Sequence, residues 1–222
     1  MDVNQMYNIV LLATGKNREQ GYVSSDDFNT YISLGMRSYI AYLIGDFQTY
    51  QPGRPISKIN FGQNSTVRQR LAPTIKSTSL TIASDGTAQY PADYLQYDAI
   101  TTSANKKIKF IQQSQIPSVL NSLLRPIASY PIFMIKNAGF QFYPLSLGSA
   151  NLSYISNPVN IKWGFTLDVN NRKVYDPTTS VQPIFDDLVV LEIIVRALSL
   201  IGVNLTLPMV TQYASDIKIN GQ

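Results

Sequence analysis

The sequence contains no cysteine and no histidine. Without cysteine the chain has no disulfide framework and no thiolate metal site. Without histidine it has no Ser-His-Asp triad and no imidazole-bound metal. A chain of 222 residues with 45% hydrophobic side chains can still bury a sizeable core.

Charged side chains are also scarce. They make up 14% of the chain, against roughly 25% in ordinary soluble domains. The polar surface must therefore come from Asn, Gln, Ser, Thr and the 14 tyrosines. Such a surface protects weakly against association, which fits a protein buried in an assembly. An AT-rich genome, which favours Asn, Lys, Tyr and Ile, explains the same composition equally well.

The charge balance is only mildly basic, with 18 basic and 14 acidic side chains and a net charge of +4. The one tight basic group is Lys106, Lys107 and Lys109, which we interpret as the solvated face of a strand. A dedicated nucleic-acid binder carries denser clusters of Lys and Arg. The most apolar stretch, residues 188–207, includes Glu192 and Arg196 and reads as a core helix. We expect no signal peptide and no contact with a membrane.

Helical periodicity marks both ends of the chain. Residues 2–14 place apolar side chains on one stripe, and residues 26–48 continue that spacing after an N-cap at Ser24 or Ser25. From residue 181 a third helical pattern runs to Gly202. A short helix is expected at residues 116–124.

The middle of the chain has short β-branched and aromatic runs separated by Pro, Gly and Asn. The sequence predicts an α+β fold, in which N- and C-terminal helices (1–50 and 181–222) form a bundle and residues 56–175 form a β-rich insertion in a single domain, 1–222. Turns are expected at Asp85–Gly86 and at Asn137–Gly139. The expected strands are residues 79–83, 94–102, 106–112, 132–136, 139–143, 152–155 and 162–166.

Few side chains suggest chemistry. The adjacent pairs Asp26–Asp27 and Asp186–Asp187 open predicted helices, where carboxylates stabilise the positive end of the dipole. Glu192 and Arg196 stand four residues apart and are expected to pair. Residues 62–66 lack the Gly-Lys-Ser/Thr ending of a phosphate loop. We expect the single tryptophan, Trp163, in the core, and no catalytic or metal-ligating residue is assigned.

Four segments in order resemble elements of phage adaptor proteins. Residues 90–97 (YPADYLQY) look like their Pro-x-Asp strand start, and residues 130–144 like their paired strands. Residues 151–158 (NLSYISNP) are similar to a strand that ends in Tyr-hydrophobic-x-x-Pro, and Phe185–Leu188 to the opening of their terminal helix. The chain thus resembles the podovirus tail tubular protein A group and the ring proteins of crAss-like phages.

This resemblance implies a virion protein made in the host cytoplasm. Such proteins form homo-oligomeric rings, commonly twelvefold, in the connector between portal and tail. The implied partners are the portal protein and neighbouring tail ring proteins. We expect the ring to line the DNA passage, so that DNA passes through it non-specifically. No catalytic residue and no cofactor are implied, and we expect no enzyme activity.

A cyclic ring needs two different contact surfaces on each subunit. We place one around Tyr31, Tyr39 and Tyr42 on the long helix and the other on the β-rich middle. Three arginines beside a possible loop, Arg54, Arg68 and Arg70, either reach a neighbour's carboxylates or phosphates or are simply solvated.

The last segment, residues 204–222, is too apolar for a free tail. We expect Met209 and Tyr213 to dock it on an adjacent subunit or on the next ring. The alternative is that the segment folds back on its own chain.

A different function remains open. Tyr90, Tyr94 and Tyr97 could stack on sugars, as in a carbohydrate-binding or accessory tail component. Tyrosines at a strand start are more typical of packing.

Overall fold

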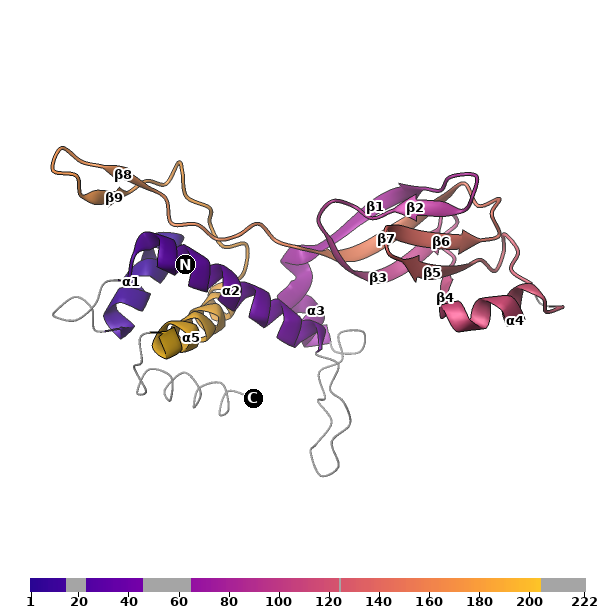
Figure 1. Ribbon diagram of the computed structural model, residues 1–222, viewed down its shortest axis with the longest axis horizontal. Helices are drawn as coiled ribbons and strands as arrows, with labels where there is room; N and C mark the ends of the chain where they lie inside the picture. Colours follow the sequence, from indigo (N-terminus) through magenta and orange to yellow (C-terminus); the bar gives the residue numbers. More distant parts are fainter. Residues whose placement is uncertain (15–22, 46–64, 124, 205–222) are drawn as a thin grey trace, which may run out of the picture. The chain divides into compact units, whose positions relative to one another are not determined.

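The computed structural model describes residues 1–14, 23–45, 65–123 and 125–204. The chain forms two compact units. Residues 1–73 and 159–222 belong to the first, which we call the helical unit, and residues 74–158 form the second, the β unit. Five α-helices and three sheets are present in the described part (Figure 1), which confirms the mixed α+β class.

The helical unit begins with two capped helices. Helix α1 (Val3–Ala13) starts at Asp2, whose side chain accepts the Gln5 N–H at 2.7 Å in a capping box. Helix α2 (Ser25–Ile44) starts at Ser24, which forms the same reciprocal pair with Asp27. The capping boxes satisfy backbone donors that would otherwise lack partners. The predicted role of Asp27 as a helix-start carboxylate is confirmed.

Helix α5 (Asp187–Asn204) starts six residues later than the helical pattern predicts. The segment before it contains Pro183, and the residue before a proline disfavours the helical region. A short helix, α3 (Ser65–Leu71), lies where a β-rich texture was expected, and a 3₁₀ turn, η1 (Ala72–Thr74), follows it.

Helices α2 and α5 pack closely, side by side (Figure 1). The two helices approach closely at Gly35, where an added Cβ would lie 2.9 Å from the Ile193 carbonyl oxygen. The glycine in the middle of α2 is therefore explained by packing rather than by a break in the helix. The buried apolar side chains of the two helices are Phe28, Ile32, Met36, Tyr39, Ile40, Leu43, Val189, Val190, Ile193, Ile194, Ala197, Leu198 and Ile201.

A two-stranded hairpin completes the described part of the helical unit. Strands β8 (Phe165–Leu167) and β9 (Lys173–Tyr175) pair antiparallel across a turn in which Asp168 accepts the N–H groups of Asn170 and Arg172. Trp163 anchors the base of the hairpin: its ring lies 4.5 Å from that of Tyr7, and its Nε1 donates to Asn4. Trp163 is buried, which confirms its predicted place in the core.

The β unit contains two sheets. The first has the order β1-β7-β3, from strands β1 (Ile75–Thr81), β7 (Ser149–Ser156) and β3 (Tyr94–Thr102). The second has the order β2-β6-β5-β4 and is built from β2 (Thr87–Gln89), β6 (Gly139–Tyr143), β5 (Ile132–Lys136) and β4 (Lys109–Phe110). The predicted turns at Asp85–Gly86 and Asn137–Gly139 are present. A 3₁₀ turn, η2 (Gln113–Gln115), and helix α4 (Ile116–Leu120) lie between β4 and β5.

The two sheets are joined by hydrogen bonds at one pair of edges, β3 and β4, and are unpaired at the other pair, β1 and β2. A bridge between Thr101 and Lys107 links β3 toward β4, and the Ile108 N–H donates to the Ile100 carbonyl at 2.8 Å. The strands therefore run in the order β1-β7-β3-β4-β5-β6-β2 around one core, and β1 and β2 are not paired with each other. The core residues are Leu80, Ile82, Ala88, Ile100, Ile108, Phe133, Phe140, Phe142, Ala150, Leu152 and Tyr154.

Candidate subunit-contact surfaces

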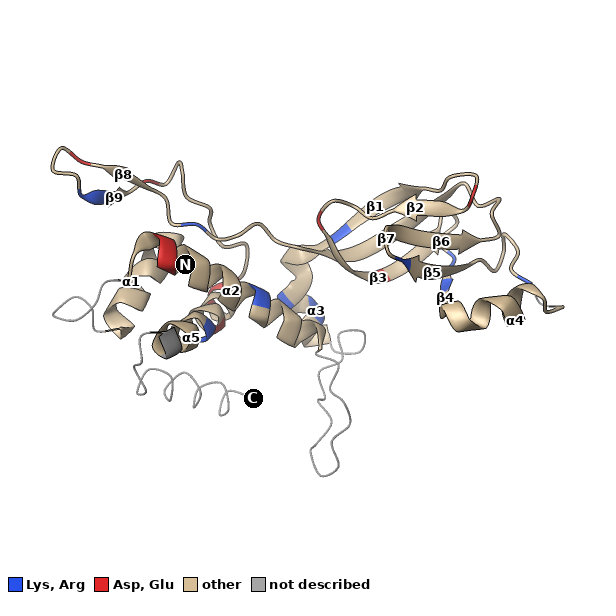
Figure 2. Cartoon of the chain, viewed as in Figure 1, with Lys and Arg blue, Asp and Glu red and all other residues tan. Residues whose placement is uncertain are grey.

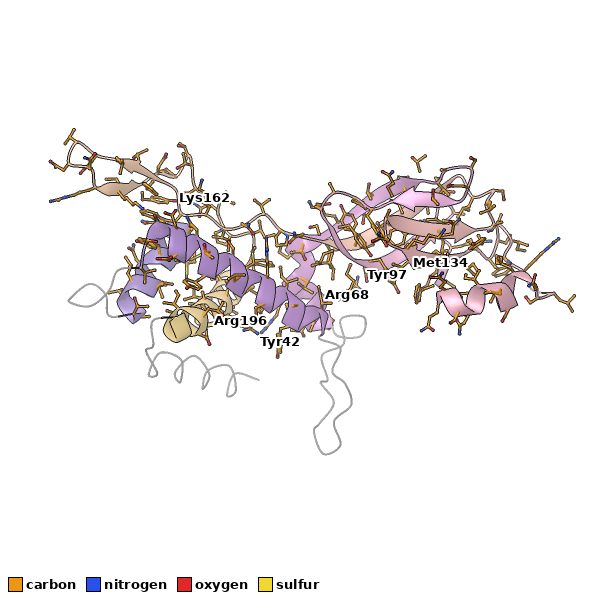
Figure 3. All side chains as sticks on the ribbon, viewed as in Figure 1. Tyr42, Arg68, Tyr97, Met134, Lys162 and Arg196 are labelled. Carbon is orange, nitrogen blue, oxygen red and sulfur yellow. The ribbon has the colours of Figure 1, made fainter. Side chains whose placement is uncertain are left out.

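The helical unit holds a cluster of two tyrosines and three charged residues, which come from α2, α3 and α5. Tyr39 is fully buried, and its ring meets that of Phe185 edge-on at 6.4 Å between centroids. The Arg196 guanidinium lies 5.2 Å from the Tyr39 ring and 4.9 Å from the Tyr42 ring. Figure 3 labels Tyr42 on α2 and Arg196 on α5. Cation–π contacts of this kind join the two helices.

An ion pair joins α3 to the same cluster. The Nη1 of Arg70 lies 2.8 Å from the Oε1 of Glu192 on α5, and about two fifths of each side chain is exposed. The predicted pairing of Glu192 with Arg196 is wrong, because among the described ion pairs Glu192 meets Arg70. A half-exposed pair contributes at most about 1 kcal/mol, so its main effect is to position α3.

The Tyr39 hydroxyl is buried and has no hydrogen-bond partner in the described part of the chain. Burial raises the pKa of Tyr39, and the charge of Glu192 raises it further, while the nearby Arg70 lowers it. Arg70 lowers the pKa through its charge and through a contact with the hydroxyl that falls short of hydrogen-bond geometry. The phenol therefore stays neutral at physiological pH.

The predicted contact residues fall into three groups. Tyr39, Tyr42 and Arg70 come together in this cluster, with Tyr39 inside the unit, where its ring cannot reach another subunit. Tyr31 lies half-buried on α2, and Arg68 lies on α3 (Figure 3). Arg54, Met209 and Tyr213 lie outside the described residues.

Large apolar side chains are exposed on α5 and on the hairpin. Leu188 and Leu191, three residues apart on one face of α5, are 75% and 43% exposed. On the β8–β9 hairpin Leu167, Val169 and Val174 are exposed, Val169 completely. The sequence indicated a core helix at α5, and the exposure of these residues was missed. The alternation of apolar residues around Asp168 was the signal for the hairpin.

The tyrosines near the start of β3 pack inward. The rings of Tyr90 and Tyr94 stack on each other at 4.4 Å and 9°, and both meet Phe140 edge-on. The Tyr94 hydroxyl accepts the Tyr97 N–H at 3.0 Å, and burial raises the pKa of Tyr94 to about 12. Their faces are used within the β unit, which fits packing better than a sugar-binding platform.

A groove of about 470 Å³ runs between β1 and β2 in the β unit. We call it the β1–β2 seam, because it lies between the two end strands, which are not paired with each other. Its lining has no charged side chain: it consists of Thr78, Ser79, Leu80, Thr81, Ala83, Thr87, Ala88, Gln89, Tyr90 and Pro91. Charged residues are sparse over the β unit as a whole (Figure 2). Sequence reasoning missed this seam, although the uncharged Ser/Thr run of residues 77–81 was a signal for it.

No metal-binding cluster was found among the described residues. None of the helices described has the length and apolar character to cross a membrane. Lys106, Lys107 and Lys109 are exposed, in agreement with a solvated face.

Compared with known proteins, the chain matches no protein-family model and none of the curated proteins searched.

Proposed function

We propose that the chain is a structural virion protein that forms a homo-oligomeric ring in the connector between phage portal and tail. The ring lines the DNA passage and has no catalytic role. Its partners are further copies of the chain, the portal protein and neighbouring tail ring proteins. The finer fold that we propose is a bundle of the terminal helices that carries the β-rich middle as an insertion.

The observation that carries this proposal is the exposed apolar surface of α5 and of the β8–β9 hairpin. Leu188 and Val169 expose most of their side chains in a chain in which only 14% of residues are charged. Exposed apolar surface is typical of assembly contacts. Isolated two-stranded hairpins are only marginally stable in water, so contact with a partner would stabilise this one.

Two different surfaces per subunit favour a closed ring. The α5 face and the hairpin differ in shape and sequence, so a contact between one surface and the other is heterologous. Repeated by a fixed rotation, such a contact closes a ring. The order of the motifs that resemble phage adaptor proteins supports the location in the connector, and the sparse charge supports passage of DNA without sequence readout.

Mass measurement of the purified protein and of virions tests the proposal. We expect a closed oligomer of the chain and its presence in virions beside the portal. A variant with Leu188→Ser and Leu191→Ser should lose the oligomer, whereas the matched control Leu95→Ser, at an exposed leucine of the β unit, should keep it. A chain that stays monomeric and is absent from virions would contradict the proposal.

A further inference from the structure

The free edge of β1 offers unused backbone hydrogen-bonding groups. The Ile82 N–H donates to the directly opposed Gly148 carbonyl at 3.1 Å. In an antiparallel pair, hydrogen-bonded and non-hydrogen-bonded positions alternate. The register of β1 on β7 therefore turns the N–H and C=O groups of Ser77, Ser79 and Thr81 away from β7. No hydrogen bond to them is found in the described part of the chain.

The seam is therefore a position where one further strand could pair with the edge of the sheet. β1 and β2 are the end strands of the two sheets. The Asp85–Gly86 turn connects them, and beside this turn the Ala83 N–H donates to the Thr87 carbonyl at 2.8 Å. An extended segment that entered the seam would pair with β1 and would place alternate side chains over Leu80 and Ala88 of the core. Main-chain hydrogen bonds of this kind give affinity in β-strand addition, and alternate side chains give specificity.

We propose that the β1–β2 seam accepts residues 208–215 from the C-terminal segment of a second copy of this chain. The seam has no charged side chain, and residues 204–215 (NLTLPMVTQYAS) contain none either. Val210, Thr211 and Tyr213 favour strands. Pro208 stands at the start of the proposed strand, a position where its missing N–H is tolerated.

In this contact the seam of one copy meets the C-terminal segment of the next, which are two different surfaces of the chain. Such a contact links successive copies in one direction. This inference rests on the self-association in the proposed function, but not on the location in a virion.

The absence of native cysteine gives a direct test in the full-length protein. One chain carries Ser79→Cys at the free edge of β1, and the other carries a single cysteine at one of the positions 209–213. The two are mixed and oxidised. A disulfide requires Cα atoms within about 7 Å, so only an adjacent strand gives a strong product. Ser114→Cys, an exposed serine of the same unit on η2, is the matched control.

With Ser79→Cys we expect a disulfide-linked dimer when the second chain carries its cysteine at alternate positions of 209–213. With Ser114→Cys we expect no such dimer. An equal yield with both serine positions, or none with Ser79→Cys, would overturn the inference. A chain that carries both cysteines and closes its own disulfide at high dilution would also overturn it, because the segment would then fill its own seam. If the mass measurement shows a closed oligomer but the cross-link does not form, this inference is contradicted and the proposed self-association is not.

Discussion

Tyr39 places a phenol hydroxyl in the core of the helical unit without a hydrogen bond from the described residues. A buried polar group without a partner costs about 1–3 kcal/mol. Removal of the hydroxyl in Tyr39→Phe should therefore raise the free energy of unfolding by about 1 kcal/mol. Urea unfolding of the two proteins measures this difference. A loss of stability would mean that the hydroxyl has a hydrogen-bond partner, with Arg70 as the nearest candidate.

Asp93 lies in the turn before β3 and links strands β1 and β7. Its carboxylate accepts the Lys76 ammonium at 2.5 Å and the Tyr154 hydroxyl at 2.8 Å, and these hydrogen bonds lower its pKa. A lowered pKa in the folded state means that the stabilisation is present above the ordinary value of about 3.9 and is lost as the pH falls through the folded value.

Asp93→Asn should consequently remove this acid dependence. We expect the variant to be less stable than the parent at pH 6 by less than about 1 kcal/mol, because Lys76 is mostly exposed. The difference should disappear near pH 2. Urea unfolding at the two pH values measures it, with the parent protein as the control for the other carboxylates. A difference independent of pH would contradict the assignment.

At the scale of elements, Gly35 is a position where α2 and α5 approach closely. Alanine normally stabilises a helix interior by about 1 kcal/mol relative to glycine. Here the new Cβ would lie 2.9 Å from a backbone oxygen and 3.1 Å from the Ala197 nitrogen, and neither atom can move without the helix. We expect the steric cost to exceed the gain in helix propensity, so that Gly35→Ala lowers the free energy of unfolding by about 1–3 kcal/mol.

Gly148→Ala is the matched control, because nothing lies within 4 Å of an added Cβ at that position. Its unfolding free energy should stay close to that of the parent. Equal stability of the two variants in a thermal or urea denaturation experiment would show that α2 and α5 are farther apart than the structure places them.

Local sequence patterns predicted the positions of helices and strands better than they predicted which residues contact each other across the fold. Helices α1 and α2 were predicted within a few residues, because caps and helical periodicity are local. Helix α3 was missed because seven residues offer too few turns for a periodic signal. The pairing of Arg70 with Glu192 was also missed, because 122 residues separate the two in sequence and only the tertiary fold brings them together. The exposure of Leu188 likewise depends on which face of α5 is covered by α2.

At the scale of the whole molecule, the β unit has the properties of an independent domain. The two ends of residues 74–158 meet, since the Ser156 Oγ donates to the Thr74 carbonyl at 2.8 Å. Adjacent ends let a segment be excised without breaking its internal strand pairs. Its core is also its own and includes Phe133, whose ring contacts four other aromatic rings.

We therefore expect a fragment of residues 74–158 to fold alone, with a single cooperative unfolding transition in urea. Phe133→Ala in the fragment should abolish that transition, because loss of a buried aromatic side chain costs about 3–5 kcal/mol. Leu95→Ala, at an exposed side chain of β3, should leave the transition in place. A fragment without a cooperative transition would mean that the β unit depends on the rest of the chain. An insertion that folds alone can be added to a helical ring protein without disturbing the helices. A fragment that does not fold would therefore remove this support for a β-rich middle carried as an insertion.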